Sequence, residues 1–408
     1  MKVLLVAYAF GEGSKAEGVM SFNLFRALRR HGCCVTVLTA EQIEEANVVS
    51  IKTSKVLRRM SKLYVGTPVK VAYYSFIKNA LKIAKQIGTG YDIIQHVSPR
   101  SLRFHDPLWQ VGAPFIWGPV GGSIDLPPAF AALSAREPFI KRLRKLDGVR
   151  LRYDPTLRRM LEKSAAIVLT SSAAKHKVPV RYHNKVRIIP EDMPANIEDM
   201  ATFDIANAQK SPYIFSSGRL VPDKGLEYLI LAFRKIAFTT DVDLVITGEG
   251  PERSRLESII MKEGLSSRVR LLGRVSRRDN LGLMGKALFC VYPSLNEAFG
   301  AVNIESMAMG MPIICADWGG PAEIVQDGVT GFKVRPESVP KYVSGLAERM
   351  AWLLNDGEAR KRMGESARKR FRNKFTTAVT ARQYVELYKQ LVGRSDGIIM
   401  DPENWTRG

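Results

Sequence analysis

Several features that mark other protein classes are missing from this chain of 408 residues. No apolar run reaches the roughly 18 residues that a membrane-spanning helix needs. The N-terminal run MKVLLVAYAF ends in GEGSKAEG rather than in a small-residue cleavage site, so we expect a buried first strand and not a signal peptide. Cysteines are few and have neither metal-ligand spacing nor the pattern of a disulfide framework: Cys33, Cys34, Cys290 and Cys315. These absences favour a reducing, cytoplasmic compartment.

Acidic residues are scarce in the first half of a chain whose net charge is +21. Residues 1–200 hold 31 Lys and Arg against 16 Asp and Glu. Between Ala46 and Tyr91 there is no acidic residue, and nine basic ones occur: Lys52, Lys55, Arg58, Arg59, Lys62, Lys70, Lys78, Lys82 and Lys85. A second basic stretch runs from Lys141 to Arg159. Such stretches suit an anionic partner.

Part of the acid-free stretch has a helical pattern that allows two interpretations. The segment from Tyr73 to Ile87 puts Phe76, Ala80, Ile83 and Ile87 near one face, with its lysines elsewhere. A helix of this kind can lie on an anionic membrane surface, which predicts peripheral membrane contact. The alternative is that the apolar face belongs to an ordinary core and the lysines are solvated.

Strand-like apolar runs alternate with helical patterns along the whole chain, which predicts a parallel sheet in each half. The polar, proline-containing segment 191–211 is typical of a linker. We therefore predict an α/β protein with two Rossmann-like, doubly wound domains facing a cleft. The predicted parts are an N-terminal acceptor-binding domain (1–190), the linker (191–211), a C-terminal donor-binding domain (212–375), a helix that can pack back on the first domain (376–392) and a mobile tail (393–408).

The stretch NEAFGAVNIESMAMG, from Asn296 to Gly310, places Glu297 and Glu305 eight positions apart across a turn and the start of a helix. An apolar strand precedes it and another follows. A helix start after a strand presents free N–H groups and favours anions. A carboxylate on either side can accept hydrogen bonds from hydroxyl groups. The pattern therefore predicts a nucleotide-sugar site, with the diphosphate between a ribose and a sugar.

Three further segments suit the same site. In SGRLVPDKG, Arg219 and Lys224 stand in a loop after a strand, where two cations can hold a diphosphate. TGEGPE is a glycine-rich turn from a strand to a helix, and DWGGPAEIVQDGVTG contains Gly319 and Gly320, which permit close backbone approach. Each segment alone is equally compatible with solvated charges or plain turn chemistry.

Taken together, in this order and at these spacings, the segments resemble the retaining glycosyltransferases of family 4, which have the GT-B fold. The resemblance covers most of the C-terminal half. It implies that Arg219 and Lys224 bind the diphosphate, that Glu297 holds hydroxyls of the donor sugar and that Glu305 holds the ribose. It also implies a contribution to nucleotide-sugar binding from a further set of residues: Arg274, Val275, Phe299, Gly300, Ala301 and Val302.

The N-terminal half matches this family less closely. The usual paired glycines of its first loop are replaced by Glu17 and Gly18, so only Gly18 is expected near the phosphate. His96 ends a strand where the family has a histidine near the reacting sugar carbon, although a strand-end histidine is often purely structural. The glycines of PFIWGPVGGSIDLPP either shape the acceptor side or form a turn without substrate contact.

The resemblance implies a hexosyltransferase-type enzyme that retains anomeric configuration and passes a sugar to a glycan or lipid-linked acceptor. Such an acceptor belongs to cell-surface polysaccharide or glycolipid synthesis at the inner face of the membrane. No Asp-x-Asp motif ends a strand, so we expect catalysis by Arg219, Lys224, Glu297 and His96 without a metal or a cofactor other than the donor. A small soluble metabolite remains an alternative acceptor.

Three other classes explain less of the sequence. A basic nucleic-acid-binding protein fits the charge, but the basic stretches contain no recognised motif and no interleaved aromatic residues. A dehydrogenase would need Gly-x-Gly-x-x-Gly after the first strand, where the chain has GEGSKAEG. A glycosidase could use Glu297 and Glu305 as its paired catalytic carboxylates, but that function does not account for the helix start between them or for the two cations upstream.

Overall fold

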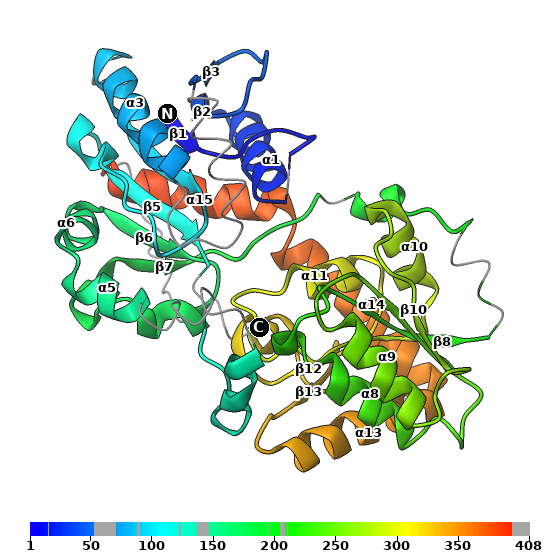
Figure 1. Cartoon of the computed structure of the whole chain (residues 1–408). Coiled ribbons are helices and arrows are strands. Elements are labelled where there is room, and N and C mark those ends of the chain that lie inside the picture. Colours follow the sequence, from blue (N-terminus) through cyan, green and yellow to red (C-terminus); the bar gives the residue numbers. More distant parts are fainter. Residues whose placement is uncertain are drawn as a thin grey trace. The chain divides into compact units, whose positions relative to one another are not determined.

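The computed structural model describes residues 1–14, 16–52, 71–87, 90–121, 124–136, 147–194, 196–204, 209 and 211–393. These residues form two compact units, shown in Figure 1. The first comprises the described residues of Met1–Ser123, Phe139–Asp192 and Thr377–Gly408, and the second those of Ile124–Pro138 and Met193–Thr376. Each unit has its own parallel sheet and its own core, which confirms the predicted α/β class.

Seven parallel strands form the sheet of the first unit, in the order β3-β2-β1-β4-β5-β6-β7. Six of them correspond to the apolar runs of the sequence, and β3 is too short for such a run to be visible. Their bounds are β1 Lys2–Ala7, β2 Cys34–Thr39, β3 Val48–Ser50, β4 Ile93–Ser98, β5 Phe115–Val120, β6 Ala166–Leu169 and β7 Val186–Ile188.

Helices cover both faces of this sheet because successive residues of its strands point to opposite sides. Val3 and Leu5 of β1 share a core with α1 (Ala16–Arg30) and α15 (Thr377–Leu391). Leu4 and Val6 of the same strand share a second core with α3, α5 and α6. These three helices span Val71–Ile87, Asp147–Tyr153 and Pro155–Lys163.

The apolar face of α3 is part of the second core. Phe76 and Ala80 are fully buried, Ile83 is half-buried and Ile87 is 44% exposed. The prediction that this face lies on a membrane is therefore wrong for Phe76 and Ala80, whose side chains are already packed beneath the sheet. Several basic residues of the two basic stretches lie outside the described residues: Lys55, Arg58, Arg59, Lys62, Lys70, Lys141, Arg142, Arg144 and Lys145.

Six parallel strands form the sheet of the second unit, in the order β10-β9-β8-β11-β12-β13. All six correspond to apolar runs of the sequence. Their bounds are β8 Tyr213–Ser217, β9 Asp243–Thr247, β10 Val269–Leu271, β11 Cys290–Tyr292, β12 Ile313–Ala316 and β13 Gly331–Val334. The helices are α8 Leu226–Arg234, α9 Arg253–Lys262, α10 Arg277–Lys286, α11 Ala301–Ala308, α12 Gly319–Ile324, α13 Val339–Asn355 and α14 Gly357–Lys374.

The second unit also includes residues 124–136, which the sequence analysis assigned to the N-terminal domain. Phe130, in a short 3-10 helix, packs edge-on against Tyr228 and Tyr342, with ring centroids 5.1 and 5.6 Å away. Arg136 forms ion pairs with Glu227, at 2.7 Å, and with Glu252. All four partners come from the second unit and lie at least 90 residues further along the chain, so no local pattern indicates this packing.

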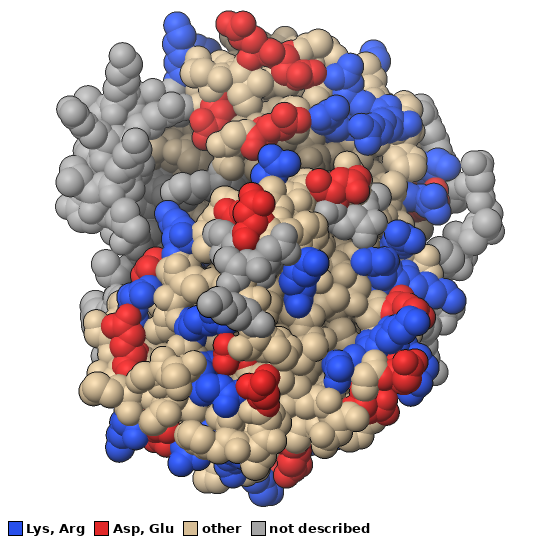
Figure 2. Space-filling model, turned by 90° about the vertical axis from the view of Figure 1, so that its right-hand side faces the viewer, with Lys and Arg blue, Asp and Glu red and all other residues tan. Residues whose placement is uncertain are grey.

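No helix in the described part of the chain is both long enough and apolar enough to cross a membrane. On the face shown in Figure 2, Lys and Arg side chains form several groups with acidic side chains between them. The positive charge on that face is therefore not gathered into one continuous patch.

Candidate active site

The strand order of the second unit reverses next to β8. β9 and β10 follow on one side of β8, and β11, β12 and β13 lie on the other. Ligands of open α/β sheets bind at such a reversal, outside the carboxyl ends of the strands. A hollow lies there, lined by the residues that follow β8 and β11, by the start of α11 and by Lys224 and Glu297.

Lys224 and Glu297 form an ion pair in this hollow. Lys224 ends the short 3-10 helix Pro222–Lys224 after β8, and Glu297 lies in the loop between β11 and α11. Their side chains are 19% and 26% exposed, so both groups can still reach a ligand. Arg219, in the same loop as Lys224, is exposed and makes no ion pair with any residue that the structure describes. Lys224 and Arg219, the two side chains predicted to bind the diphosphate, thus differ in exposure and in ion-pair partners.

Gly300 precedes α11 in a left-handed conformation, with φ of 99°, which strongly favours glycine. A Cβ there would lie 2.7 Å from Nδ2 of Asn303. The N–H groups of Ala301 and Val302, the first two of α11, have no partner within the helix and carry its partial positive charge, whereas the N–H of Asn303 donates to the carbonyl of Gly300. Phe299 is only 5% exposed, so its backbone and not its ring can take part in the site.

Gly319 and Gly320 stand behind the loop that carries Glu297. The N–H of Gly320 donates to the carbonyl of Glu297 at 2.9 Å, and a Cβ on Gly320 would lie 2.3 Å from the carbonyl oxygen of Phe299. Of the two interpretations, turn chemistry therefore fits: these glycines support the loop and do not face the hollow.

The loops after β8, β9 and β10 are held against one another by backbone hydrogen bonds. Leu220 N–H donates to Glu249 O at 3.0 Å, and Gly248 N–H donates to Gly273 O at 2.8 Å. Arg274, which is exposed, and Val275, which is half-buried, follow directly in the third loop. The loops with Lys224, with TGEGPE and with Arg274 therefore lie side by side along the carboxyl edge of the sheet.

Glu305, within α11, forms an ion pair with Arg277 at the start of α10, with Oε1 and a guanidinium nitrogen 3.0 Å apart. The Glu305 side chain is 16% exposed. Burial raises the pKa of this carboxyl group above its ordinary value, and the Arg277 charge offsets only part of that rise. Arg277 is not predictable as a site residue from the sequence, because its partner is 28 residues away and no local pattern marks it.

This burial has a consequence for stability that can be measured. A carboxyl whose pKa is higher in the folded protein binds more protons there than in the unfolded chain, so the free energy of unfolding falls as pH rises from about 4.5. We expect Glu305→Gln to raise the melting temperature at pH 8, by the order of 1 °C, and to leave it unchanged near pH 4. The exposed Glu348→Gln should shift neither value. A lower melting temperature for Glu305→Gln at pH 8 would show that the Arg277 pair outweighs burial.

Two buried polar atoms of the hollow have no hydrogen-bond partner among the described residues: Oγ of Ser216 and Oδ1 of Asn303. Both residues are 1% exposed. The amide of Asn303 donates through Nδ2 to the carbonyl of Gly300 at 3.0 Å, which fixes its orientation, so Oδ1 is the free acceptor. Buried polar groups are nearly always paired, which marks this end of the hollow as a place for a polar ligand atom. Neither residue was predicted for the site, because Asn303 is an ordinary position within α11 and Ser216 an ordinary position within β8.

Two residues of the first unit, His96 and Gly18, were also predicted for the site. His96, in β4, is fully buried, with Nδ1 2.9 Å from Asp106 Oδ2 and Nε2 3.0 Å from the carbonyl of Pro99. Both ring nitrogens are therefore engaged, and the structural alternative fits His96 better than the catalytic one. Gly18 is buried in α1, where a Cβ would lie 3.1 Å from the backbone nitrogen of Phe10, so it lets the loop after β1 fold over the helix start.

No cluster of residues with the chemistry of a metal site occurs in the described part of the chain.

The glycines considered for the acceptor side include Gly118, which has φ of 130°. A Cβ there would lie 2.3 Å from the carbonyl oxygen of Val168, so close packing of strands accounts for a glycine at this position. Gly122, the other glycine considered for the acceptor side with Gly121, lies outside the described residues.

Comparison with known proteins assigns the second unit. Residues 199–370 match the family model of glycosyl transferases, group 1. This region of the chain belongs to that family. The matched region holds every residue proposed for the donor site except those of the first unit, so the family assignment and the hollow coincide.

The curated relatives differ in how much of this chain they cover. The alpha-D-kanosaminyltransferase of Streptomyces kanamyceticus is 32% identical over 44% of the chain and 46% of that protein. The O-antigen chain mannosyltransferase C of Escherichia coli is 27% identical over 91% of the chain and 93% of that protein. The chain spans about half the length of the first curated relatives that it matches.

Among solved structures, Anabaena Alr3699/HepE in complex with UDP and glucose has a TM-score of 0.64 and 18% identity, over 96% of this chain and all of that one. This likeness establishes the fold alone. It confirms the predicted GT-B type of two doubly wound units.

Proposed function

We propose that this protein is a glycosyltransferase that moves a sugar from a nucleoside-diphosphate sugar to a glycan or lipid-linked acceptor, with retention of anomeric configuration. The observation that carries the proposal is the Lys224–Glu297 pair beside the start of α11, at the reversal of the sheet. A cation, a carboxylate and free N–H groups within one hollow suit a ligand that carries both phosphate and hydroxyl groups.

In this proposal the ion pair opens when the donor binds. The ammonium group of Lys224 moves to the diphosphate, which the first N–H groups of α11 and the exposed Arg219 also bind. The carboxylate of Glu297 then accepts hydrogen bonds from sugar hydroxyls, and Glu305 accepts them from the ribose. Because Arg277 holds Glu305, it positions that carboxylate for the ribose.

Ser216 and Asn303 extend this proposal to the inner end of the hollow. Because Oδ1 of Asn303 can only accept, the ligand atom that meets it must belong to a hydroxyl or an N–H group. A phosphate oxygen would be repelled there. We therefore assign this end of the hollow to a hydroxyl of the donor or to a water that one of its hydroxyls binds.

The proposed reaction breaks the bond between the anomeric carbon and the diphosphate oxygen. The acceptor oxygen bonds to the same face of that carbon, and the proton of the acceptor hydroxyl passes to the departing diphosphate. Lys224, Arg219 and the N–H groups of α11 stabilise the negative charge that develops on the leaving group. These groups supply the charge for which other enzymes use a divalent ion, so we propose that neither a metal nor any cofactor besides the donor is needed.

The name of the relative that aligns along nearly the whole chain supports an acceptor in cell-surface polysaccharide or glycolipid synthesis. Such acceptors lie at a membrane, and the chain carries a net charge of +21. We therefore propose peripheral contact with an anionic membrane at its cytoplasmic face. The contact is electrostatic, since the apolar face of α3 is used in the core.

The donor proposal is tested by thermal shift with UDP-, GDP- and ADP-sugars, with and without EDTA. A donor at about 100 times its dissociation constant adds about 2.7 kcal/mol to the stability of the form that binds it, so a clear rise in melting temperature is expected. UDP-glucose is the first to try, because the Anabaena protein holds UDP and glucose. A shift that EDTA abolishes would contradict the metal-independent mechanism. A shift with NADH or an oligonucleotide, and with no nucleotide sugar, would contradict the proposed function itself.

A further inference from the structure

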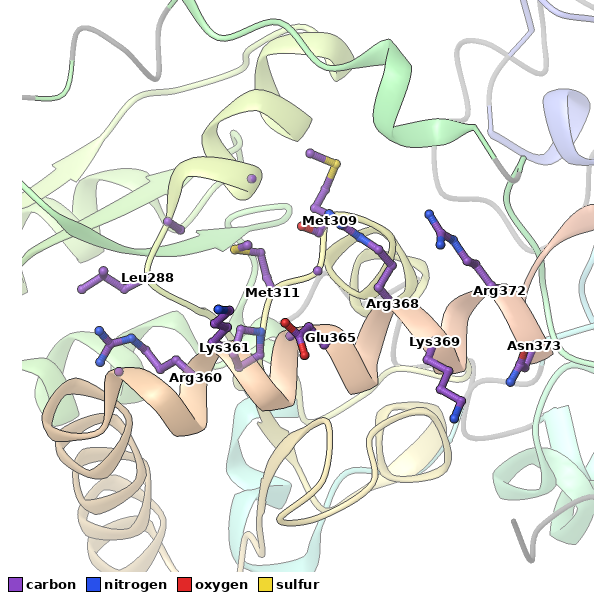
Figure 3. Close-up of a pocket in the computed structure, with 16 residues that line it drawn as sticks. Leu288, Met309, Met311, Arg360, Lys361, Glu365, Arg368, Lys369, Arg372 and Asn373 are labelled. Carbon is purple, nitrogen blue, oxygen red and sulfur yellow. Dashed lines mark hydrogen bonds between the residues drawn. The ribbon is translucent and has the colours of Figure 1, made fainter.

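A second hollow lies at the opposite edge of the same sheet. It is lined by one face of α14, by Gly285, Ala287 and Leu288, which lead into β11, and by residues 309–312, which lead into β12. These are the amino ends of the two strands, whereas the candidate active site lies at their carboxyl ends. The volume is about 750 Å³. Figure 3 shows this groove, which we call the α14 groove.

Five basic residues of α14 line the α14 groove, against a single acidic one, Glu365. The basic residues recur at helical spacing along one face: Arg360, Lys361, Arg368, Lys369 and Arg372. Arg360 donates to the carbonyls of Leu353 and Leu354, and Arg368 donates to those of Ala308 and Met309. Lys361 and Lys369 are exposed and form no ion pair with any described residue, so the groove keeps the positive charge of these two side chains.

The remaining wall of the groove is apolar. Leu288, Met309, Met311 and Pro312 line it, and Figure 3 shows Arg368 extending from α14 toward Met309. Gly364 lets α14 pack closely against the backbone of Gly310, since a Cβ on Gly364 would lie 2.2 Å from the carbonyl oxygen of Gly310. A row of cations thus borders an apolar surface, which suits an anionic amphiphile better than a fully hydrated ion.

We propose that the α14 groove binds the phosphate groups of anionic membrane lipids. From Arg360 to Arg372 the row of cations extends over roughly 18 Å at 1.5 Å per residue, which is longer than one soluble phosphate or pyrophosphate needs. The apolar wall offers a surface for the glycerol and acyl part next to the phosphate. The inference names the surface for the proposed membrane contact, on which it rests, and it does not depend on the transferase reaction.

The test compares two double variants of the full chain that lose the same charge. Lys361→Gln with Lys369→Gln changes the groove, while Lys262→Gln with Arg362→Gln removes two basic residues elsewhere in the second unit. All four side chains are exposed and have no ion pair with any described residue, so both variants should fold. Binding is measured by co-sedimentation with vesicles of phosphatidylcholine and phosphatidylglycerol, and with vesicles of phosphatidylcholine alone.

We expect the wild-type chain to bind the phosphatidylglycerol vesicles at low salt and to be released at high salt. Two basic residues lost from the contact surface should lower this binding about 30-fold, and the control variant should bind nearly as the wild type does. Thermal shifts by the nucleotide sugar should be equal in all three proteins, because the donor site lies at the other edge of the sheet.

Each other outcome overturns the inference in a different way. If the wild type binds vesicles and the groove variant binds equally well, membrane contact stands and the groove has no part in it. If no protein binds vesicles, both the membrane contact and the groove assignment fail, while the donor shift still tests the transferase. Stabilisation of the wild type by inorganic pyrophosphate or an acidic peptide, lost in the groove variant and without vesicle binding, would assign the groove to a soluble anion.

Discussion

Lys224→Ala is expected to lower kcat for sugar transfer by about 10²–10³-fold, with a much smaller change in the KM for the donor. Removing one charged or hydrogen-bonding group that acts on a developing oxyanion has an effect of this size. Lys224 is only 19% exposed and lies beside the start of α11, where its charge acts in a partly water-excluded hollow. The measurement is initial rates with the donor that the thermal-shift screen identifies.

A comparison with Arg219→Ala sharpens this prediction. Arg219 is exposed and has no ion-pair partner among the described residues, so solvent screens its charge and its loss should cost less than that of Lys224. The exposed Lys262→Ala serves as the control and should turn over at the wild-type rate. Wild-type turnover by Lys224→Ala would remove Lys224 from the mechanism. An effect larger for Arg219 than for Lys224 would reverse their proposed order.

Lys224 and Glu297 also have to be tested together, because each is the other's partner. If the pair only held the loop in place, the double change Lys224→Met with Glu297→Gln would restore much of what either single change loses. If each group has its own role on the donor, the double variant should be at least as slow as the slower single variant. A cycle of the four proteins separates these two cases through the coupling energy.

The sequence predicted those parts of the second unit that rest on local patterns. Buried strands show as apolar runs, and parallel strands bring their carboxyl ends to one edge, so the loops with Lys224 and Glu297 were expected to meet. A turn and a helix start were expected between Glu297 and Glu305, and α11 begins there after Gly300, which has a positive φ. These features need only the identity of residues within one loop or strand.

The parts that could not be predicted depend on partners distant in the sequence. Arg277 reaches Glu305 only because α10 packs beside α11. Phe130 belongs to the second unit because its ring packs against Tyr228 and Tyr342, which lie far along the chain. His96 is the converse case, a residue that was predicted for the site and that the structure places elsewhere. Its position at the end of a strand suggested chemistry, and only the structure revealed that Asp106 and the Pro99 carbonyl already engage its ring.

Gly225→Ala is expected to destabilise the second unit by about 2–5 kcal/mol and to reduce transfer strongly. Gly225 follows Lys224 directly and has φ of 66°, so any other residue there is strained by roughly 1–2 kcal/mol. A Cβ would also lie 2.3 Å from the carbonyl oxygen of Pro293, which adds an overpacking cost of about 1–3 kcal/mol. The measurement is urea unfolding of both proteins, together with transfer rates below the transition.

Gly264→Ala is the matched control, because Gly264 has nearly the same φ, 70°, with no atom within 4 Å of the added Cβ. It should show the backbone strain alone and keep its activity, so the difference between the two variants measures the contact with Pro293. That contact joins the loop of Lys224 to the loop of Glu297, which are also linked where Leu295 N–H donates to Asp223 O at 2.8 Å. If both variants lost the same stability and both stayed active, the close approach at Gly225 would not hold the ion pair in place. The spacing of Lys224 and Glu297 would then have to come from the glycines behind the second loop.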